Sequence, residues 1–278
     1  MTGFGNNAFI ALKNNARVDL VGVFTPLRQK GPFPYYPCEP LHEVVTRCDV
    51  SVYEGLSLRD QETQSLIRSL SPDLIVVATF NQIIPHSIIS LPCRGVINIH
   101  PSLLPKYRGS IPTVCALLQG EERTGVTAHF IEDESIDRGR IIAQAAVNID
   151  PADNDGILRR KLSDTLPAVL TEAIDRVQSQ ELLSFPEQQE SEATYCLKRS
   201  VICSDIDVNQ PFSMIVNKIR SLTPYPGAYI ISGSVRYPVN GVTLVETPER
   251  DLNRQSYSDV LVINTSQGIM KFSIQKAS

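Results

Sequence analysis

The 278-residue chain has no tryptophan and no apolar run near the ~20 residues that a membrane-spanning helix needs. Its first residues, MTGFGNNAF, lack the basic stretch and apolar core of a secretory signal peptide. Hydrophobic residues make up 42% and charged residues 20%, which is ordinary for a globular protein. These absences exclude a membrane protein and favour a cytoplasmic one with no membrane partner.

A surplus of basic residues is also missing. Lys and Arg number 26 against 30 Asp and Glu, which gives a formal net charge of −4 at pH 7. This balance provides no general attraction to nucleic acid.

Clustered metal ligands are absent as well. The four histidines are far apart, and the cysteines form no C-x-x-C pair. The sequence therefore predicts no metal and no zinc site, and reduced, mostly buried thiols. The six cysteines are Cys38, Cys48, Cys93, Cys115, Cys196 and Cys203.

Short apolar runs alternate with helical patterns over the first 180 residues. Strands are expected at 18–24, 74–80, 95–100, 127–131 and 140–147, and helices from Leu41, at 61–70 and at 153–178, the last kinked by Pro167. This alternation predicts an α/β fold with a mostly parallel, Rossmann-like sheet covered on both faces. In such sheets, ligands bind at the carboxyl ends of the strands.

The composition changes near residue 180. Residues 179–204 are polar and acidic, and they are followed by a helical stretch at 211–222 and four strand-like bursts that begin near Tyr229, Val242, Val260 and Met270. We therefore expect a catalytic domain at 1–180, a linker at 181–204 and a small β domain at 205–278.

The first residues resemble the turn between a strand and a helix, through Gly3-Phe-Gly5-Asn6-Asn7. Only Met1 and Thr2 precede them, so we expect that the first strand is missing through truncation; a sheet with one strand fewer is the alternative. A glycine-rich turn at a helix start suits an anion, which makes Gly5 and Asn6 candidate substrate-binding residues. A dinucleotide site is the weaker interpretation, because no acidic residue is placed for a ribose.

Asn98 and His100 lie two apart on a predicted strand, so their side chains project from the same face. An amide can donate to an oxygen that becomes negative, while an imidazole transfers a proton. Taken alone, the two residues are explained more simply as a structural pair.

Asp137 lies in the acidic loop Asp133-Glu-Ser-Ile136-Asp137-Arg-Gly, between two predicted strands, from which it can reach back to His100. A nearby carboxylate raises the pKa of an imidazole and orients it, as a proton shuttle requires. A solvated acidic loop is the alternative.

The order and spacing of three segments resemble the formyltransferases that use 10-formyltetrahydrofolate. The segments are Asn98-Ile-His100-Pro-Ser-Leu-Leu-Pro-Lys-Tyr-Arg-Gly109, Thr124-Gly-Val-Thr127 and Ile136-Asp137-Arg-Gly-Arg-Ile-Ile142. The resemblance extends over about residues 18–147. The stretch Ile219–Tyr229 resembles the entry to the OB-like C-terminal domain of the tRNA and sugar-amine branches.

The resemblance implies that Asn98 donates to the formyl oxygen, that His100 stabilises the intermediate and relays a proton, and that Asp137 sets the state of His100. It implies no metal and no covalent enzyme intermediate. The folate is expected to contact Phe80, Ile83, Ile84, Ser102, Leu104, Asp133 and Ile136. The acceptor is expected to contact Gly5, Asn6, Lys106, Tyr107 and Arg108.

Charge bears on which amine is formylated. The only basic residues in the segment 27–40 are Arg28 and Lys30. Residues 204–278 contain seven Lys or Arg and six Asp or Glu. A tRNA platform needs clustered cations. We therefore favour a small acceptor, such as an amino-sugar nucleotide or an amino-acid derivative, over methionyl-tRNA. A hydrolase that releases formate from 10-formyltetrahydrofolate and an inactive binding module rank lower, and a homodimer stays open.

Overall fold

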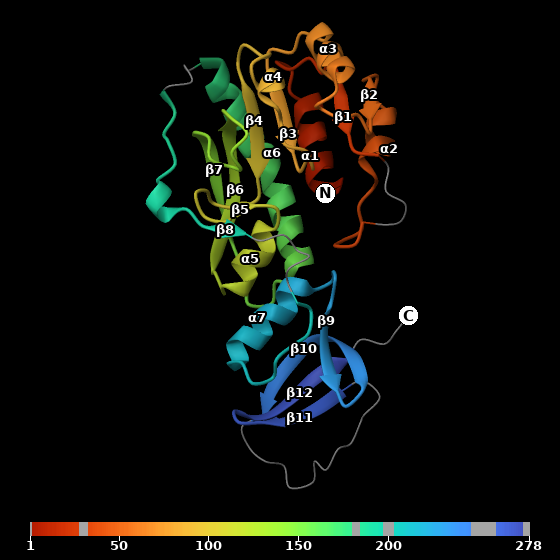
Figure 1. The fold of residues 1–278 in the computed structure, drawn as a ribbon, viewed down its shortest axis with the longest axis vertical. Coiled ribbons are helices and arrows are strands. Elements are labelled where there is room, and N and C mark those ends of the chain that lie inside the picture. Colours follow the sequence, from red (N-terminus) through yellow and green to blue (C-terminus); the bar gives the residue numbers. More distant parts are fainter. Residues whose placement is uncertain (1, 28–32, 180–183, 197–202, 246–259, 275–278) are drawn as a thin grey trace.

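The computed structural model describes residues 2–27, 33–179, 184–196, 203–245 and 260–274. An α/β unit is followed by a smaller β unit at the other end of the molecule (Figure 1). Among the described helices, none is long and apolar enough to cross a membrane.

The α/β unit contains the expected alternation of elements. They are α1 (Thr2–Lys13), β1 (Val23–Thr25), α2 (Leu41–Thr46), β2 (Val52–Glu54), α3 (Gln61–Ser69), β3 (Ile75–Ala78), α4 (His86–Ile89), β4 (Val96–His100), β5 (Arg108–Gly109), α5 (Pro112–Leu118), β6 (Arg123–Ile131), β7 (Ile141–Asn148) and α6 (Asp155–Ser179).

The central sheet has the strand order β3-β4-β6-β7. The β3–β4 pair is parallel, but β6 and β7 run antiparallel to their neighbours, a direction that short apolar runs do not reveal. Strands β1 and β2 form a separate parallel pair. A cavity of about 520 Å³ lies between residues 18–24 and β3, and no described strand fills it.

The core of this unit is built around α6, which runs along the sheet (Figure 1). Leu158, Leu162, Leu166 and Leu170 recur every four residues on one face of the helix and are wholly buried. The burial of these side chains fixes the sheet that positions the site.

Pro167 lies inside α6, and the helix continues without interruption from Asp155 to Ser179. A proline has no N–H, so the carbonyl of Ser163 loses its partner within the helix. The Asn7 side chain of α1 donates to that carbonyl at 2.8 Å. The helix therefore tolerates Pro167, because Asn7 of α1 donates to the carbonyl that has no partner within α6.

The prediction of a glycine-rich turn at residues 3–7 is wrong, because α1 already begins at Thr2. Gly3 is needed for close packing: a Cβ there would lie 2.0 Å from the Tyr36 hydroxyl. Gly3 thus marks a tight contact with Tyr36, and these residues lie within a helix and not in an open anion-binding turn.

The described part of the predicted linker, residues 184–196, packs on the α/β unit. It contains a 3₁₀ turn (Glu190–Glu192) and the short strand β8 (Tyr195–Cys196), which pairs in parallel with β5. Cys196 forms a disulfide with Cys115 of α5, with the two Cα atoms 6.2 Å apart. The expectation of reduced thiols is therefore wrong for this pair, whose partners are separated by 81 residues.

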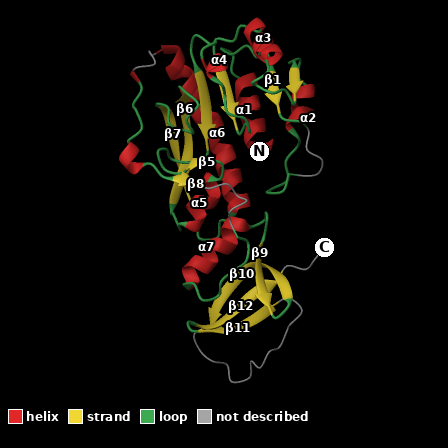
Figure 2. Ribbon diagram, in the orientation of Figure 1, coloured by secondary structure: helices red, strands yellow, loops and turns green. Residues whose placement is uncertain are grey.

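The C-terminal unit consists of α7 (Phe212–Leu222) and four antiparallel strands in the order β11-β12-β10-β9 (Figure 2). The strands are β9 (Ala228–Ser232), β10 (Val235–Val245), β11 (Val260–Thr265) and β12 (Gly268–Ile274). They form the expected OB-like half-barrel, which has its own core. Helix α7 contacts α5, and Gly156 donates its N–H to the Thr223 carbonyl, so the two units touch.

Candidate active site

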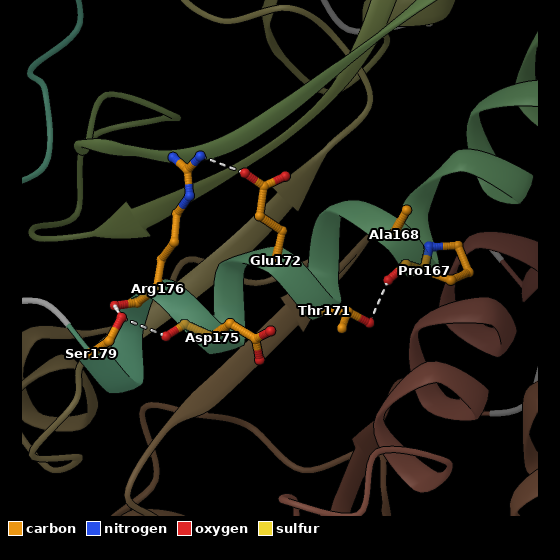
Figure 3. Close-up of a pocket in the computed structure, with 7 residues that line it drawn as sticks. All are labelled: Pro167, Ala168, Thr171, Glu172, Asp175, Arg176 and Ser179. Carbon is orange, nitrogen blue, oxygen red and sulfur yellow. Dashed lines mark hydrogen bonds and ion pairs between the residues drawn. The ribbon is translucent and has the colours of Figure 1, made fainter.

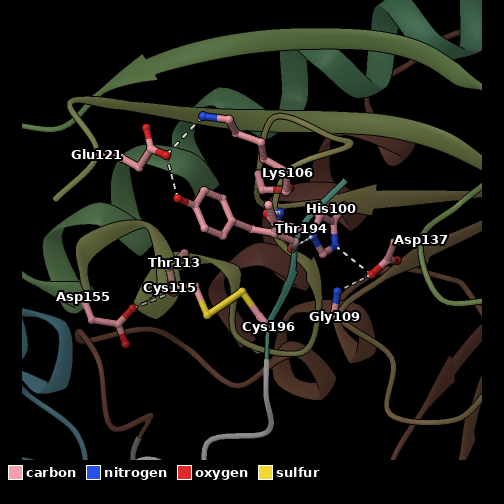
Figure 4. The surroundings of a disulfide bond; sticks show 12 residues. His100, Lys106, Gly109, Thr113, Cys115, Glu121, Asp137, Asp155, Thr194 and Cys196 are labelled. Atoms are coloured by element: carbon pink, nitrogen blue, oxygen red, sulfur yellow. Dashed lines mark hydrogen bonds and ion pairs between the residues drawn. A yellow bond between two sulfur atoms is a disulfide. The ribbon is translucent and has the colours of Figure 1, made fainter. Parts of the chain in front are cut away.

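Asn98, His100 and Asp137 converge at the end of β4. The Asn98 amide donates to Asp137 Oδ1 at 3.1 Å. His100 Nδ1 lies 3.5 Å from Asp137 Oδ2 (Figure 4). The structure thus brings together an amide, an imidazole and a carboxylate that the sequence separates by up to 39 residues.

His129 on β6 is a fourth member, which lies outside the predicted set of catalytic residues. It pairs with Asn98 across the β4–β6 ladder, where its Nε2 lies 3.1 Å from the Asn98 amide and 3.4 Å from Asp137 Oδ1. The β6–β7 register shifts between Ala128 and His129, as at a β-bulge, which re-aims a side chain.

Two backbone carbonyls determine which nitrogen of each neutral imidazole carries the proton. A carbonyl oxygen only accepts, so His100 Nε2 donates to the Tyr107 oxygen at 2.9 Å and His129 Nδ1 donates to the Phe130 oxygen at 2.8 Å. The remaining nitrogens, His100 Nδ1 and His129 Nε2, therefore face Asp137. A proton that His100 takes up arrives directly beside the carboxylate.

Burial lowers the pKa of His100, while Asp137 and the Tyr107 carbonyl oppose that effect. Burial by itself raises the pKa of Asp137, yet the two imidazoles and the Gly109 N–H together hold this pKa well below its ordinary value. These opposite effects favour the ionised form of Asp137 and the neutral form of His100.

The backbone around the site is constrained. Gly109 donates its N–H to Asp137 Oδ2 at 2.9 Å and has φ +114°, with the Cys196 carbonyl 2.8 Å from where a Cβ would be. Thr79, Tyr107 and Asp137 also have positive φ. Such strained residues cluster at functional sites, and all three lie on loops next to the strand ends.

The two loops expected to bind folate adjoin one another. The backbone N–H of His86 donates to the Glu134 carboxylate at 3.4 Å, which joins residues 80–86 to residues 132–137. Ile83 and Ile136 are 50% and 55% exposed. Two large apolar side chains thus remain uncovered on neighbouring loops.

The other predicted folate contacts differ in exposure. Phe80 is partly buried, Ile84 is buried and Asp133 is exposed, with its carboxylate accepting from the Ser135 N–H. Leu104 is buried and Ser102 is wholly buried. Their described contacts are internal: Ser102 Oγ donates to the Lys106 carbonyl, and the Leu104 N–H donates to Thr127.

The residues expected to bind the acceptor are largely committed elsewhere. Arg108 has no exposed surface, and its guanidinium donates to Gln188, Glu190 and Tyr195. Lys106 and the Tyr107 hydroxyl both contact Glu121 (Figure 4).

At the start of the chain, Gly5 and Asn6 are buried within α1. The Asn6 amide donates to the Glu39 carbonyl. Neither residue therefore presents an open anion site in this structure.

A hollow of about 590 Å³ lies away from this cluster, along α6 (Figure 3). Its charged residues are already paired, Arg176 with Glu172 and Asp175 with Arg17. We assign it no ligand. Within the described residues, no group of three or more His, Cys, Asp or Glu side chains is placed to hold a metal ion.

Residues 9–174 match the model of the formyl transferase family. The chain belongs to this family. It is 33% identical to the methionyl-tRNA formyltransferase of Syntrophomonas wolfei over 270 residues, covering 93% of this chain and 84% of the relative. It is 36% identical to that of Bacillus licheniformis over 228 residues, covering 81% of this chain and 69% of the relative.

Solved structures extend the formyltransferase fold to the whole chain. The sugar 3N-formyl transferase WlaRD, solved with dTDP and 5-N-formyl-THF, matches with a TM-score of 0.71 at 20% identity, covering 100% of this chain and 96% of its own. The N-formyltransferase from Helicobacter canadensis, in complex with folinic acid and dTDP-3-aminofucose, matches with a TM-score of 0.68 at 18% identity, covering 98% and 96%. The family membership makes this chain a formyltransferase.

Proposed function

We propose that this formyltransferase moves the formyl group of 10-formyltetrahydrofolate to the amine of a small acceptor, such as an amino-sugar nucleotide or an amino-acid derivative. The observation that carries the reaction is the cluster of Asn98, His100, His129 and Asp137, in which the amide and one ring nitrogen of each imidazole face the same carboxylate. Such a cluster can accept the proton that an amine releases when it attacks a formyl carbon.

Asn98 would stabilise the oxyanion that forms on the formyl oxygen. Both hydrogens of its amide are used within the cluster, one by Asp137 and one by His129. The amide must therefore exchange one of these bonds when the donor enters. Catalytic hydrogen bonds commonly tighten or rearrange in this way on substrate binding.

His100 would take up the amine proton at Nδ1 and hold it against Asp137 Oδ2. As His100 becomes charged, it also lies beside the negative oxygen, so one transfer serves both acid–base and electrostatic catalysis. Burial favours the neutral imidazole before the reaction, which leaves His100 able to act as the base.

Exposed apolar side chains favour a place for the folate. Ile83 and Ile136 can contact the flat pterin, because their loops adjoin and both side chains are uncovered. Asp133 and Phe80 lie on the same two loops. Ser102 and Leu104 are buried and would position the residues that contact the folate.

A small acceptor is favoured by how the cations are used. Lys106 pairs with Glu121, and Lys161 pairs with Asp153. Arg108 and Arg159 are buried. These four cations are therefore paired or buried, whereas recognition of a tRNA backbone requires several phosphate contacts.

The loop before α2 gives a second reason. Phe33 packs edge-on against Tyr35 and Tyr36, and the Arg159 guanidinium lies 4.2 Å from the Tyr35 ring. The described part of this loop is thus an aromatic cluster held against α6, whereas binding to tRNA calls for an extended basic loop.

Methionyl-tRNA is the second candidate acceptor. The chain is 33% identical over nearly its whole length, C-terminal unit included, to a methionyl-tRNA formyltransferase. This similarity is the observation that favours tRNA as the acceptor.

The experiment is incubation of the purified chain with 10-formyltetrahydrofolate and a panel of amines, followed by mass spectrometry. The panel contains dTDP-amino sugars, free amino acids and initiator methionyl-tRNA at physiological salt. We expect formylation of a small amine. Efficient turnover of methionyl-tRNA alone would establish the second candidate, and formate release without any formylated amine would indicate a hydrolase.

A further inference from the structure

Gln188 lies in the segment that connects the two units, outside the cluster of reacting groups. Its side-chain amide is fully used. Nε2 donates to the carbonyls of Asp137 and Gly139, both at 2.8 Å, while Oε1 accepts from Arg108 Nε at 3.0 Å and Nη2 at 2.9 Å. Two donor hydrogens and two acceptor positions are all that a glutamine amide offers.

The partners of Gln188 are the two chain segments that aim the Asp137 carboxylate. One is the loop that contains Asp137 itself, with its positive φ. The other is β5, where Arg108 is followed by Gly109, whose N–H donates to Asp137 Oδ2. Gln188 therefore joins the backbone of the carboxylate to the strand that binds its oxygen.

The connecting segment is itself firmly held on the α/β unit. Arg108 also donates to Glu190 and to the Tyr195 hydroxyl, and the Arg108 N–H donates to the Thr194 carbonyl. Phe185, just before the segment's polar run, is buried in the main core. The segment that carries Gln188 is thus held by Phe185 on one side and by the contacts of Arg108 on the other. Gln188 can therefore hold the backbone of the Asp137 loop in place.

We propose that Gln188 is a positioning residue for formyl transfer: it holds Asp137 within reach of His100 without touching the reacting atoms. The proposal rests on the role that the proposed function gives to Asp137. It assigns part of the catalytic geometry to a segment that follows the α/β domain in sequence.

Two substitutions separate the hydrogen bonds that Gln188 donates from those that it accepts. In Gln188→Glu, a carboxylate still accepts from Arg108 but can no longer donate to the Asp137 and Gly139 carbonyls. In Gln188→Ala, both sets of bonds are lost. Gln189→Ala is the matched control, because Gln189 is the adjacent glutamine and its side chain is not buried.

The primary readout is the titration of His100, followed by NMR in histidine-labelled protein. The described titratable groups that face His100 are Asp137, from its loop, and His129, from β6. If Asp137 moves away, the charged imidazole loses its counter-charge and the midpoint falls. We expect a fall of about half a pH unit or more in both Gln188 variants, with His42 and His86 unchanged.

The second readout is formyl transfer to whichever amine the panel identifies. We expect kcat to fall about 10- to 100-fold in both Gln188 variants, as displacements of about 1 Å commonly cause, and to stay unchanged in Gln189→Ala. A Gln188→Glu protein with the wild-type His100 midpoint and turnover would overturn the proposal, because Gln188 would then serve only to pair Arg108.

The two readouts also separate this proposal from the proposed function. The His100 titration requires no substrate, so it tests the positioning role even if no amine is formylated. Absence of turnover in the wild-type chain would count against the proposed function, whereas unchanged titration in both Gln188 variants would count against the positioning role.

Discussion

Asn98 is the residue through which the account of catalysis is most easily tested. We propose that its amide donates to the developing oxyanion. Removing such a donor typically lowers kcat about 10²- to 10³-fold. We therefore expect Asn98→Ala to lose that much turnover in a steady-state assay, with its thermal midpoint measured alongside. Near-normal turnover would assign oxyanion stabilisation to another group.

Asp137→Asn should change the pH dependence as well as the rate. Asp137 raises the pKa of His100 against the effect of burial, so removing the carboxylate lowers that pKa further. In the proposed mechanism His100 acts as a base, so activity is lost as pH falls through its pKa. The acidic limb of the kcat profile should therefore move to lower pH while the maximum falls. An acidic limb at the wild-type pH would show that Asp137 does not set the pKa of His100.

His129 shows where the interpretation of single residues from the sequence stops. Asn98, His100 and Asp137 could be recognised because their segments carry a distinctive order and spacing. His129 belongs to no such segment, and only the pairing of β4 with β6 places it opposite Asn98. The Thr127-x-His129 alternation was a usable signal, since residues two apart on a strand project from the same face.

At the scale of elements, most helices and strands follow from apolar periodicity. The reversed direction of β6 did not, because it depends only on how the connections between the strands run. The turn expected at Gly3–Asn7 failed because its glycines permit close packing against Tyr36 as readily as they permit a turn. Local composition could not distinguish these two uses of glycine.

The contact between α1 and α6 gives an element-scale prediction. Asn7 donates to the Ser163 carbonyl that Pro167 leaves without a helical partner. Asn7→Ala should therefore cost about 1–3 kcal/mol of the free energy of unfolding, the usual penalty for an unsatisfied buried carbonyl. In a Pro167→Ala background, the substituted residue supplies a backbone N–H that can bond the Ser163 carbonyl, and the cost should be smaller.

A double-mutant cycle measured by urea unfolding checks this coupling. Equal costs of Asn7→Ala in the two backgrounds would show that Asn7 does not compensate for Pro167. The comparison needs no enzyme assay, so it tests the fold independently of the proposed function.

At the scale of the whole molecule, the distribution of charge is the property from which we infer a small acceptor. The α/β unit pairs or buries several of its cations, and the residues from 204 onward carry a net charge of only +1, from seven Lys or Arg against six Asp or Glu. We expect initiator methionyl-tRNA to bind weakly, with formylation at physiological salt at least ~100-fold slower than that of the small acceptor. Affinity measured between low and physiological salt gives the number of phosphates contacted, and a steep loss together with fast turnover would contradict the charge argument.

The cluster around His100 is the part of the molecule to which we assign formyl transfer from folate to an amine. The most direct test is a single-turnover reaction of the wild-type chain with isotopically labelled 10-formyltetrahydrofolate and the amine panel, compared with His100→Gln and with the control His42→Gln. We predict labelled formyl-amine and an equal amount of tetrahydrofolate from the wild type and His42→Gln, with a loss of about 10²-fold or more in His100→Gln. Equal rates in all three proteins would contradict the account.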